Sequence, residues 1–390
     1  MKTTNPVKAI QNELNPIMEK LSKHVDLRTV RNISKATVGI INSRSTRISE
    51  ITHKSKRKCK RLITDAKRNY RMLKSKTWEK TDLEQERFNS IRHEIQDDIP
   101  IGIDLSHIEH PDSKAIEGVC MVHAEHKKLV PGHYWLQAAA RIDKRRILPL
   151  NSHVFSSTVK GYLSQNKTVF DFLDNLHNYI GSKGIWLFDR GFDSRILMEK
   201  LLNLKVKFVM RLKIKRNVIV DGKSKSLQSI FDESVYPYKT KIRMKRKPRI
   251  LELDFREIKI SGINERLWIV FTKSVYGETY ILLTNIKVEC FSDATKILKA
   301  YRYRWSVEDF FRAMKQELGI EKIMVRTLRR INKLIEIAIL AYTIAFKILM
   351  IGGKLVESII LAGGKLGLKK KSEDTVGRII KGLANIILLL

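Results

Sequence analysis

The segment at residues 184–213, GIWLFDRGFDSRILMEKLLNLKVKFVMRLK, places one helical pattern between two short apolar strands. The first strand covers residues 185–188 and ends at Asp189, a glycine turn follows, and the helical pattern begins near Asp193. A second strand pattern runs through Phe208. Strand, helix and strand in this order predict two parallel strands in a buried sheet. The chain should therefore have an α/β fold whose functional edge lies at the C-terminal end of the first strand, where Asp189 stands.

The chain is also strongly basic. Its 390 residues carry 75 Lys and Arg against 41 Asp and Glu, so the formal net charge is +34 and the pI is about 10.0. Such a surplus needs an anionic partner, and nucleic acid is the partner that we expect. The hydrophobic fraction of 43% indicates that most of the chain folds. A chain of this length has room for two or three domains.

Positive charge is most concentrated in the first quarter of the chain. Residues 1–95 have a helical pattern, and a polar break at 42–46 is compatible with a helix-turn-helix. Between Lys54 and Lys76 there are eleven Lys or Arg residues and one acid, Asp65. We interpret this run as a phosphate-binding surface, with a solvated helical face as the alternative. The segment is therefore predicted to be a DNA-binding domain.

The sequence favours a cytoplasmic protein. Its N-terminus has no apolar signal core, and its three cysteines are far apart, as in a reducing compartment. The most hydrophobic window begins at Leu334 and is interrupted by Glu336 and Lys347. We interpret this window as a buried core helix, with a membrane span as the alternative. We therefore expect no membrane partner.

One stretch near the C-terminus, YRYRWSVEDFFRAMKQ at 301–316, mixes charged and aromatic residues. A rotation of about 100° per residue would put four side chains on one stripe of a helix: Tyr301, Arg304, Glu308 and Lys315. The opposite side carries an apolar seam that should face the core, formed by Val307, Phe310 and Met314. An amphipathic helix accounts for the seam, but it does not account for a lone carboxylate in a basic, aromatic stripe.

Three carboxylates stand on separate predicted core elements. Asp104 lies on the polar side of an alternating strand, Asp189 ends the central strand, and Glu308 lies on the basic stripe. One acid from each of three elements can supply hard oxygen ligands for divalent metal ions. Two such ions can activate a water or a 3′-hydroxyl and stabilise the leaving oxygen during attack at phosphorus. Asp189 could instead cap a turn, and Glu308 could pair with Arg304 or Arg312.

The pattern of these residues resembles a known family. The spacing Tyr301-x2-Arg304-x3-Glu308-x6-Lys315 resembles the YREK signature of bacterial insertion-sequence transposases of the DDE type, insertion sequence family four. The motif DRGFD at 189–193 is similar to the second-Asp motif of that family, and IGIDLS at 101–106 is similar to its first. The resemblance covers residues 98–345 approximately.

This resemblance implies a fold and a set of functional residues. The fold would be an RNase H-like core with a β-rich insertion before the last carboxylate. Asp104, Asp189 and Glu308 would be the catalytic triad that binds two Mg²⁺ ions, for which Mn²⁺ can substitute. Residues expected to contact DNA are Tyr301, Arg304, Lys315, Arg211, Lys213 and Tyr280. In the family an aromatic residue of the insertion stacks on a flipped base; the matching Tyr280 replaces the expected Trp, and core packing is its alternative role.

The resemblance also implies the activity and its partners. We expect cut-and-paste transposition on double-stranded DNA, at terminal inverted repeats and a target site, by a homodimer or larger assembly at the bacterial nucleoid. A catalytically inactive or domesticated DNA-binding protein is the main alternative, and a structure-specific nuclease is a lesser one. Five domains are predicted: an N-terminal helical basic domain at 1–95, the first part of the core at 96–213, the β-rich insertion at 214–289, the second part of the core at 290–350, and a C-terminal helical region at 351–390.

Overall fold

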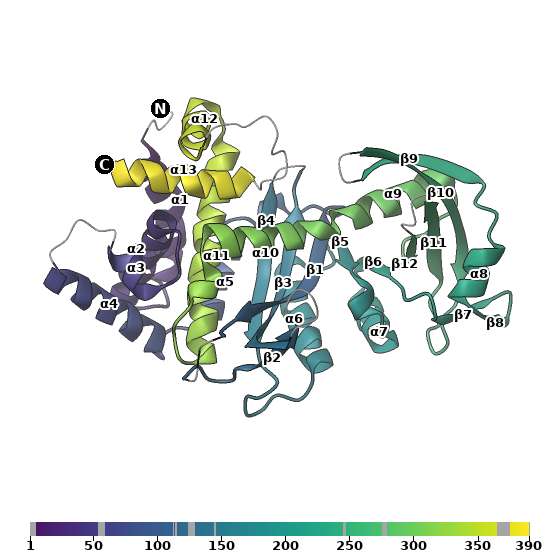
Figure 1. Cartoon of the computed structure of the whole chain (residues 1–390), viewed down its shortest axis with the longest axis horizontal. Helices are drawn as coiled ribbons and strands as arrows, with labels where there is room; N and C mark the ends of the chain where they lie inside the picture. Colours follow the sequence, from purple (N-terminus) through teal and green to yellow (C-terminus); the bar gives the residue numbers. More distant parts are fainter. Residues whose placement is uncertain are drawn as a thin grey trace. The chain divides into compact units, whose positions relative to one another are not determined.

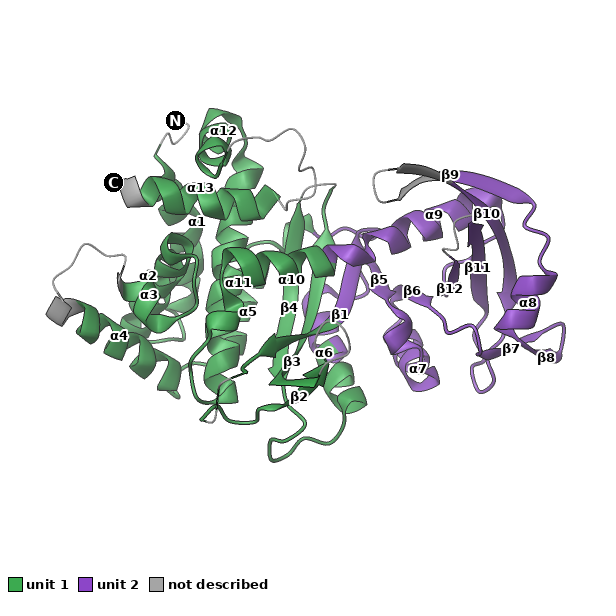
Figure 2. Cartoon of the chain, viewed as in Figure 1, with its two compact units in different colours: residues 1–94, 105–172, 307–390 green, residues 95–104, 173–306 purple. Residues whose placement is uncertain are grey.

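The computed structural model describes residues 5–53, 59–111, 113, 115–123, 129–143, 146–244, 247–274, 279–364 and 375–389. The chain forms two compact units, coloured in Figure 2. Unit 1 comprises residues 1–94, 105–172 and 307–390, and unit 2 comprises residues 95–104 and 173–306. The start of the predicted phosphate-binding run, at 54–58, lies outside the described residues.

Unit 1 is largely helical. Its helices are α1 (Pro6–Leu21), α2 (Leu27–Ser43), α3 (Ile48–His53), α4 (Cys59–Lys74), α5 (Lys80–Asn89), α10 (Ser306–Glu317, apart from Ser306 itself), α11 (Leu328–Ile351), α12 (Gly353–Ala362) and α13 (Thr375–Leu389). Its strands are β2 (Cys120–His123), β3 (Leu129–Arg141) and β4 (Ile147–Phe155). Short 3-10 turns lie at Arg92–Glu94 and Ile320–Lys322. Strand β1 (Pro100–Glu109) and helix α6 (Gln165–Ile180) each contribute to both units.

Helix α11 forms the core of unit 1. By length and composition alone it could cross a membrane, yet 78% of its most apolar 18-residue window is buried inside the protein. It packs on β4 and on helices α1, α2, α5 and α13, which surround it in Figure 1. Side chains around its whole circumference, from Ile331 to Ile348, are therefore buried. The burial supports the core-helix interpretation of the apolar window.

Unit 2 combines strands with a few helices. Its elements are β5 (Ile185–Phe188), the 3-10 turn η3 (Arg190–Phe192), α7 (Arg195–Asn203), β6 (Lys207–Arg211), β7 (Asn217–Val220), β8 (Lys223–Ser226), α8 (Leu227–Glu233), β9 (Tyr238–Met244), β10 (Lys247–Ile258), β11 (Leu267–Ser274), β12 (Tyr280–Thr284), α9 (Phe291–Arg302) and the 3-10 turn η4 (Tyr303–Trp305). The predicted strand–helix–strand segment is confirmed as β5, α7 and β6.

The strand order identifies the fold class. Strands β1 and β5 pair in parallel, and β5 and β6 also pair in parallel. Along the sheet β4 lies next to β3, β3 next to β1, and β1 next to β5 and then β6. Antiparallel strands followed by parallel strands with helical crossovers form the arrangement of an RNase H-like core. The predicted fold class, a mixed α/β protein with a central sheet and flanking helices, is confirmed (Figure 1).

The β-pattern at 214–289 extends this sheet. Strand β12 pairs antiparallel with β6, with Leu282 opposite Arg211, and strands β11, β10 and β9 continue outward in that order. Strands β7 and β8 form a separate hairpin. The predicted limits of the five domains stay predictions, since the two units divide the chain differently.

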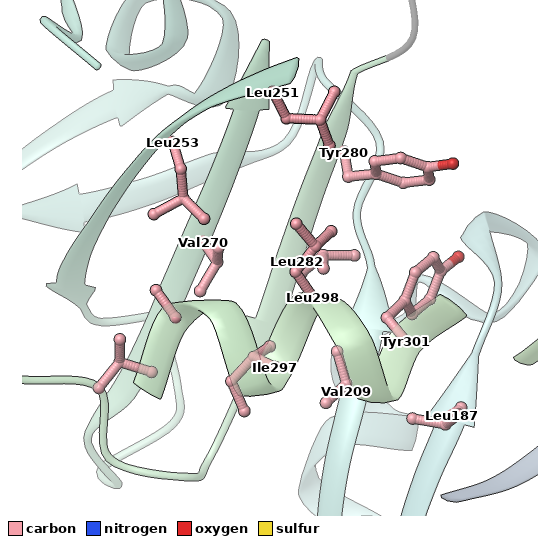
Figure 3. Close-up of a cluster of buried hydrophobic side chains, with 12 residues drawn as sticks. Leu187, Val209, Leu251, Leu253, Val270, Tyr280, Leu282, Ile297, Leu298 and Tyr301 are labelled. Atoms are coloured by element: carbon pink, nitrogen blue, oxygen red, sulfur yellow. The ribbon is translucent and has the colours of Figure 1, made fainter. Parts of the chain in front are cut away.

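A hydrophobic cluster joins α9 to the sheet of unit 2 (Figure 3). The helix contributes residues spaced at i, i+3, i+4 and i+7, which puts them on one face: Ala294, Ile297, Leu298 and Tyr301. The strands contribute aliphatic side chains and one tyrosine: Leu187, Val209, Leu251, Leu253, Val270, Tyr280 and Leu282. This contact fixes the end of α9, and with it the first two residues of the YREK-like signature, against the core.

A buried ionic contact ties the N-terminal helices to the core of unit 1. The Nε atom of Arg87, on α5, donates to Oε1 of Glu336, on α11, at 2.6 Å, and both side chains are almost fully buried. The two Nη atoms of Arg87 donate to the carbonyl oxygens of Pro149 and Leu150 on β4, each at 2.9 Å. One guanidinium therefore joins α5, α11 and β4. This contact explains how a basic N-terminal segment forms one unit with the core.

We expect Arg87→Met to lower the free energy of unfolding by about 3–5 kcal/mol, because the carboxylate of Glu336 would stay buried without its ionic partner. The double variant Arg87→Met/Glu336→Met should lose less, since both charges are gone. Urea unfolding followed by circular dichroism measures the difference. Arg92→Met, at an exposed site, is the matched control. Equal stability of the parent and both core variants would show that the contact does not stabilise unit 1.

Candidate active site

Two of the three predicted catalytic carboxylates lie at matching levels of neighbouring parallel strands, one on β1 and the other directly after β5. Gly102 of β1 is paired with Leu187 of β5, and Asp104 and Asp189 each follow two residues later. Side chains two residues apart project from the same face of a strand. The register therefore places Asp104 and Asp189 side by side on one face of unit 2, at the C-terminal end of β5 where the sequence predicts the functional edge.

Asp189 also has a local structural role. Its Oδ1 atom accepts a hydrogen bond from the backbone N–H of Gly191 at 2.8 Å, so Asp189 caps the 3-10 turn η3. The capping role that the sequence left open is therefore present. It occupies one carboxylate oxygen, and a carboxylate has a second oxygen that can serve as a ligand. Capping thus orients the side chain and is compatible with metal binding.

Arg304 holds the other carboxylate. Its Nη1 atom donates to Oδ2 of Asp104 at 2.9 Å, and the side chains of Arg304 and Asp104 are only 10% and 15% exposed. The exposures matter because an ion pair shielded from water is stronger than a surface pair. Arg304 lies on the turn η4, directly after α9, and this position brings it to the middle of β1. The structure therefore joins the YREK-like signature to the first-Asp motif within unit 2.

A second carboxylate of the DRGFD motif, that of Asp193, bonds to the segment after β6. Asp193 is buried, and its Oδ1 atom accepts from Nε of Arg216 at 2.6 Å. Its Oδ2 atom accepts from the backbone N–H of Lys213 at 2.8 Å. Asp193 therefore connects the loop that carries Asp189 to the segment after β6. Sequence reasoning missed this role, although the second Asp of the motif was a visible signal.

Two tyrosines and an arginine form a compact group beside these carboxylates. The rings of Tyr280 and Tyr301 meet edge to face, with their centroids 5.8 Å apart. The guanidinium carbon of Arg211 lies 4.9 Å from the centroid of the Tyr280 ring, and its Nη2 atom donates to the carbonyl oxygen of Thr279 at 2.8 Å. Figure 3 shows that both phenol rings extend away from the aliphatic side chains of the cluster.

The environment of this group raises the pKa of the Tyr301 hydroxyl further above neutral pH. Burial raises the pKa of Tyr301 to about 12, the negative charge of Asp189 acts in the same direction, and the charges of Arg304 and Arg211 act against it. A protonated phenol can donate a hydrogen bond to an anion. Tyr301 therefore has the chemistry expected of a residue that contacts a phosphate, although its ring is part of the core.

Tyr280 is placed in the core as well. Its side chain is 6% exposed, and Arg211 covers one face of its ring. A flipped base would have to replace the guanidinium in order to stack on that face. Core packing, the alternative that the sequence left open, is thus the contact that the structure shows, and the predicted stacking on a base stays a prediction.

Glu308 and Lys315 belong to unit 1. Glu308 is exposed on the first turn of α10, and Lys315 pairs with Glu321 through Nζ and Oε1 at 3.0 Å. Asp309, the residue after Glu308, pairs through Oδ1 with Nη1 of Arg312 on the same helix at 3.0 Å. Its Oδ2 atom lies 3.7 Å from Nη1 of Arg141 at the end of β3. Partial burial raises the pKa of Asp309, against the effect of these two arginines.

The sequence predicts one continuous helix over residues 301–316, and this prediction is wrong. Helix α9 ends at Arg302, the 3-10 turn η4 covers Tyr303–Trp305, and α10 begins at Ser306. A 3-10 turn has three residues per turn, so the assumed rotation of 100° per residue does not hold across it. The apolar seam is nevertheless confirmed, since Val307, Phe310 and Met314 are fully buried.

The donor set of unit 2 suits a hard divalent cation. Asp104 and Asp189 offer carboxylate oxygens, which Mg²⁺ and Mn²⁺ prefer to nitrogen or sulfur. Within the described ranges, no group of three or more His, Cys, Asp or Glu side chains that could hold a metal ion is present. Of the three predicted ligands, Asp104 and Asp189 belong to unit 2, and Glu308 belongs to unit 1.

Comparison with known proteins identifies the family. The transposase DDE domain matches residues 98–344, which is more than half of the chain. The protein therefore belongs to the transposase DDE domain family and is a DNA transposase by family; such domains generally use divalent metal ions. The cryo-EM structure of the piggyBac transposase synaptic complex with hairpin DNA is similar at 14% identity and a TM-score of 0.46, over 100% of this chain and 82% of that chain. No curated protein matches the chain.

We expect Tyr280→Ala to lower the free energy of unfolding by about 3–5 kcal/mol, the usual loss for removing a buried ring. Tyr280→Phe, the matched control, should be close to the parent because it keeps the ring under Arg211. Thermal unfolding measures stability, and 2-aminopurine fluorescence in a duplex end measures base extrusion. If Tyr280→Ala keeps the parent stability and loses only base extrusion, the ring serves DNA and not the core.

Proposed function

We propose that the protein is an insertion-sequence transposase of the YREK-signature family that cleaves DNA at terminal inverted repeats and joins the ends to a target. The observation that carries this proposal is the parallel register of β1 and β5, which sets Asp104 of β1 level with Asp189 directly after β5, together with the bond from Arg304 to Asp104. Family membership supplies the general activity. The signature spacing in the sequence supports the particular subfamily.

Each proposed site residue has a role that follows from its chemistry. Asp104, Asp189 and Glu308 would hold Mg²⁺, or Mn²⁺ in its place, through carboxylate oxygens. When bound, the ions supply an activated water or 3′-hydroxyl and stabilise the leaving oxygen. Arg304 and Lys315 would neutralise phosphates of the bound strand.

The neighbouring groups of unit 2 would act on the DNA around the scissile phosphate. Tyr301 would donate its hydroxyl hydrogen to a phosphate oxygen, since a phenol is protonated at neutral pH. Arg211, beside Tyr280, and the exposed Lys213 would hold DNA near the carboxylates. Asp193 would fix the backbone of Lys213 relative to the Asp189 loop, since it binds that backbone directly.

Helix α4 is the proposed DNA-binding surface of the N-terminal segment. Lys67, Arg71 and Lys74 are exposed and are spaced at i, i+4 and i+7, so they lie on one face. The opposite face is buried through Asn69, Met72 and Leu73. A stripe of cations on an exposed helical face fits the phosphates of a duplex.

The assembly and the location belong to the same proposal. Cutting and joining two ends of an element requires two active sites, so we propose a homodimer or a larger assembly on double-stranded DNA. We also propose that the protein acts at the nucleoid in the cytoplasm. A catalytically inactive, domesticated DNA-binding protein is the second candidate function, and the cleavage experiment below separates the two.

We expect Asp104→Asn, Asp189→Asn and Glu308→Gln each to abolish cleavage and strand transfer while DNA binding is kept or strengthened. Each change removes a charge needed to hold a hard cation, with little change in size. The assay measures nicking of a labelled plasmid that carries the reading frame and its flanking DNA, with Mg²⁺ and then Mn²⁺. Asp98→Asn, whose carboxylate is exposed and pairs with Lys207, is the matched control.

The same assay defines the outcomes that contradict the proposal. A parent protein that binds the DNA but never cuts it with either ion would be the inactive binder. Full cleavage by Asp104→Asn would mean that the first carboxylate is elsewhere. Loss of cleavage in the Asp98→Asn control would identify Asp98 as that carboxylate.

We expect the triple variant Lys67→Gln/Arg71→Gln/Lys74→Gln to bind duplex DNA more weakly and with a flatter salt dependence. Each lost phosphate contact should lower the slope of log K against log salt by about 0.9. Fluorescence anisotropy of a labelled duplex between low and moderate salt measures the slope. An unchanged slope would show that this face of α4 is only solvated.

A further inference from the structure

We propose that Arg304 couples metal binding to DNA binding. In the DNA-free protein Arg304 binds Asp104, and when a DNA phosphate binds Arg304 instead, Asp104 is released. This inference rests on the proposed function, since it takes Asp104 as a metal ligand. It adds a regulatory role for Arg304 beyond a phosphate contact. The free protein would then bind divalent cations weakly, and DNA would raise their affinity.

The contact with Asp104 is short and shielded. Nη1 of Arg304 lies 2.9 Å from Oδ2 of Asp104, with both side chains almost buried. The turn η4 presents Arg304, and the cluster formed by Tyr301 and its aliphatic neighbours anchors the helix before it. Arg304 therefore reaches Asp104 from a fixed element, and the pairing does not depend on a mobile surface side chain.

A guanidinium and a divalent cation compete for the same carboxylate. Both are positive, and two like charges a few ångströms apart repel each other strongly where water is partly excluded. While Arg304 donates to Oδ2, a cation bound to Asp104 would lie beside a fixed positive charge. The ion pair therefore lowers the affinity of Asp104 and Asp189 for a metal in the free protein.

A DNA phosphate offers Arg304 an alternative partner. A guanidinium binds the two oxygens of a phosphate in the same planar geometry as those of a carboxylate. Arg304 can thus exchange Asp104 for a phosphate and keep its charge neutralised. The exchange frees Asp104, whose carboxylate could then hold a divalent cation where it had held the guanidinium. Because coupling of binding is reciprocal, a bound metal must also raise the affinity for DNA.

The test measures Mn²⁺ binding to the full-length protein by electron paramagnetic resonance of free Mn²⁺. The probe is a 30-base-pair duplex of mixed sequence at low salt, since phosphate contacts do not depend on sequence, and the duplex alone is the blank. We expect the duplex to tighten Mn²⁺ binding to the parent by about 5-fold or more, the usual range of allosteric coupling. Asp104→Asn should bind Mn²⁺ weakly in both conditions.

Arg304→Gln tests the coupling itself. Without DNA, it should bind Mn²⁺ about as tightly as the parent does with DNA, and the duplex should add little. Arg304→Lys keeps a positive charge near Asp104, so the free variant should still bind Mn²⁺ weakly. This variant also shows whether a change at position 304 disturbs folding. Arg195→Gln removes an exposed arginine of unit 2 that pairs with Glu199, and it should behave as the parent.

Two results would overturn the inference, and they differ in whether the proposed function survives. If the parent and Arg304→Gln bind Mn²⁺ equally well without DNA, and Asp104→Asn does not, the metal site stands and the coupling is wrong. If the parent binds no Mn²⁺ with or without the duplex, Asp104 is not a metal ligand, and the proposed function fails together with the inference.

Discussion

The parallel pairing of β1 with β5 determines most of what unit 2 can do. Strand β5 ends at Phe188, and the pairing of Gly102 with Leu187 sets the next residue, Asp189, level with Asp104 in the middle of β1. Strand β6 continues the parallel set and carries Arg211 at its end. The positions of the acidic pair and of Arg211 therefore follow from the sheet itself.

Charge is used differently in the two units. In unit 1, Arg87 and Glu336 are buried together and serve the packing of α5, α11 and β4. In unit 2, Arg304 and Asp104 pair beside residues that are predicted to contact DNA. Arg87 has no reason to exchange Glu336 for another partner, because its two Nη atoms already donate to the carbonyl oxygens of Pro149 and Leu150. A pair of predicted DNA and metal ligands has alternative partners of matching charge, so the same contact can act as a switch.

The sequence was informative where the pattern is local. The strand at 185–188 and the helix after it could be predicted, because the apolar periodicity and the turn residues all lie within the 30-residue segment 184–213. The break at Tyr303–Trp305 could not, since a helical period is assumed to continue until a Gly or Pro interrupts it. The contacts of Asp193 with Lys213 and Arg216 were also out of reach, because they depend on how α7 returns the chain to the sheet. The burial of Tyr280 could be stated only as an alternative.

Strand β12 closes the edge that β6 would otherwise expose. The apolar residues Val209 and Met210 lie on β6 and are paired with Thr284 and Leu283 of β12. The insertion is therefore no detachable module, even though its sequence interrupts the core. A shortened chain that joined β6 directly to α9 would leave an open, apolar strand edge, and such edges pair with other chains and aggregate. Any minimal form of this protein has to keep β12, or provide another strand in its place.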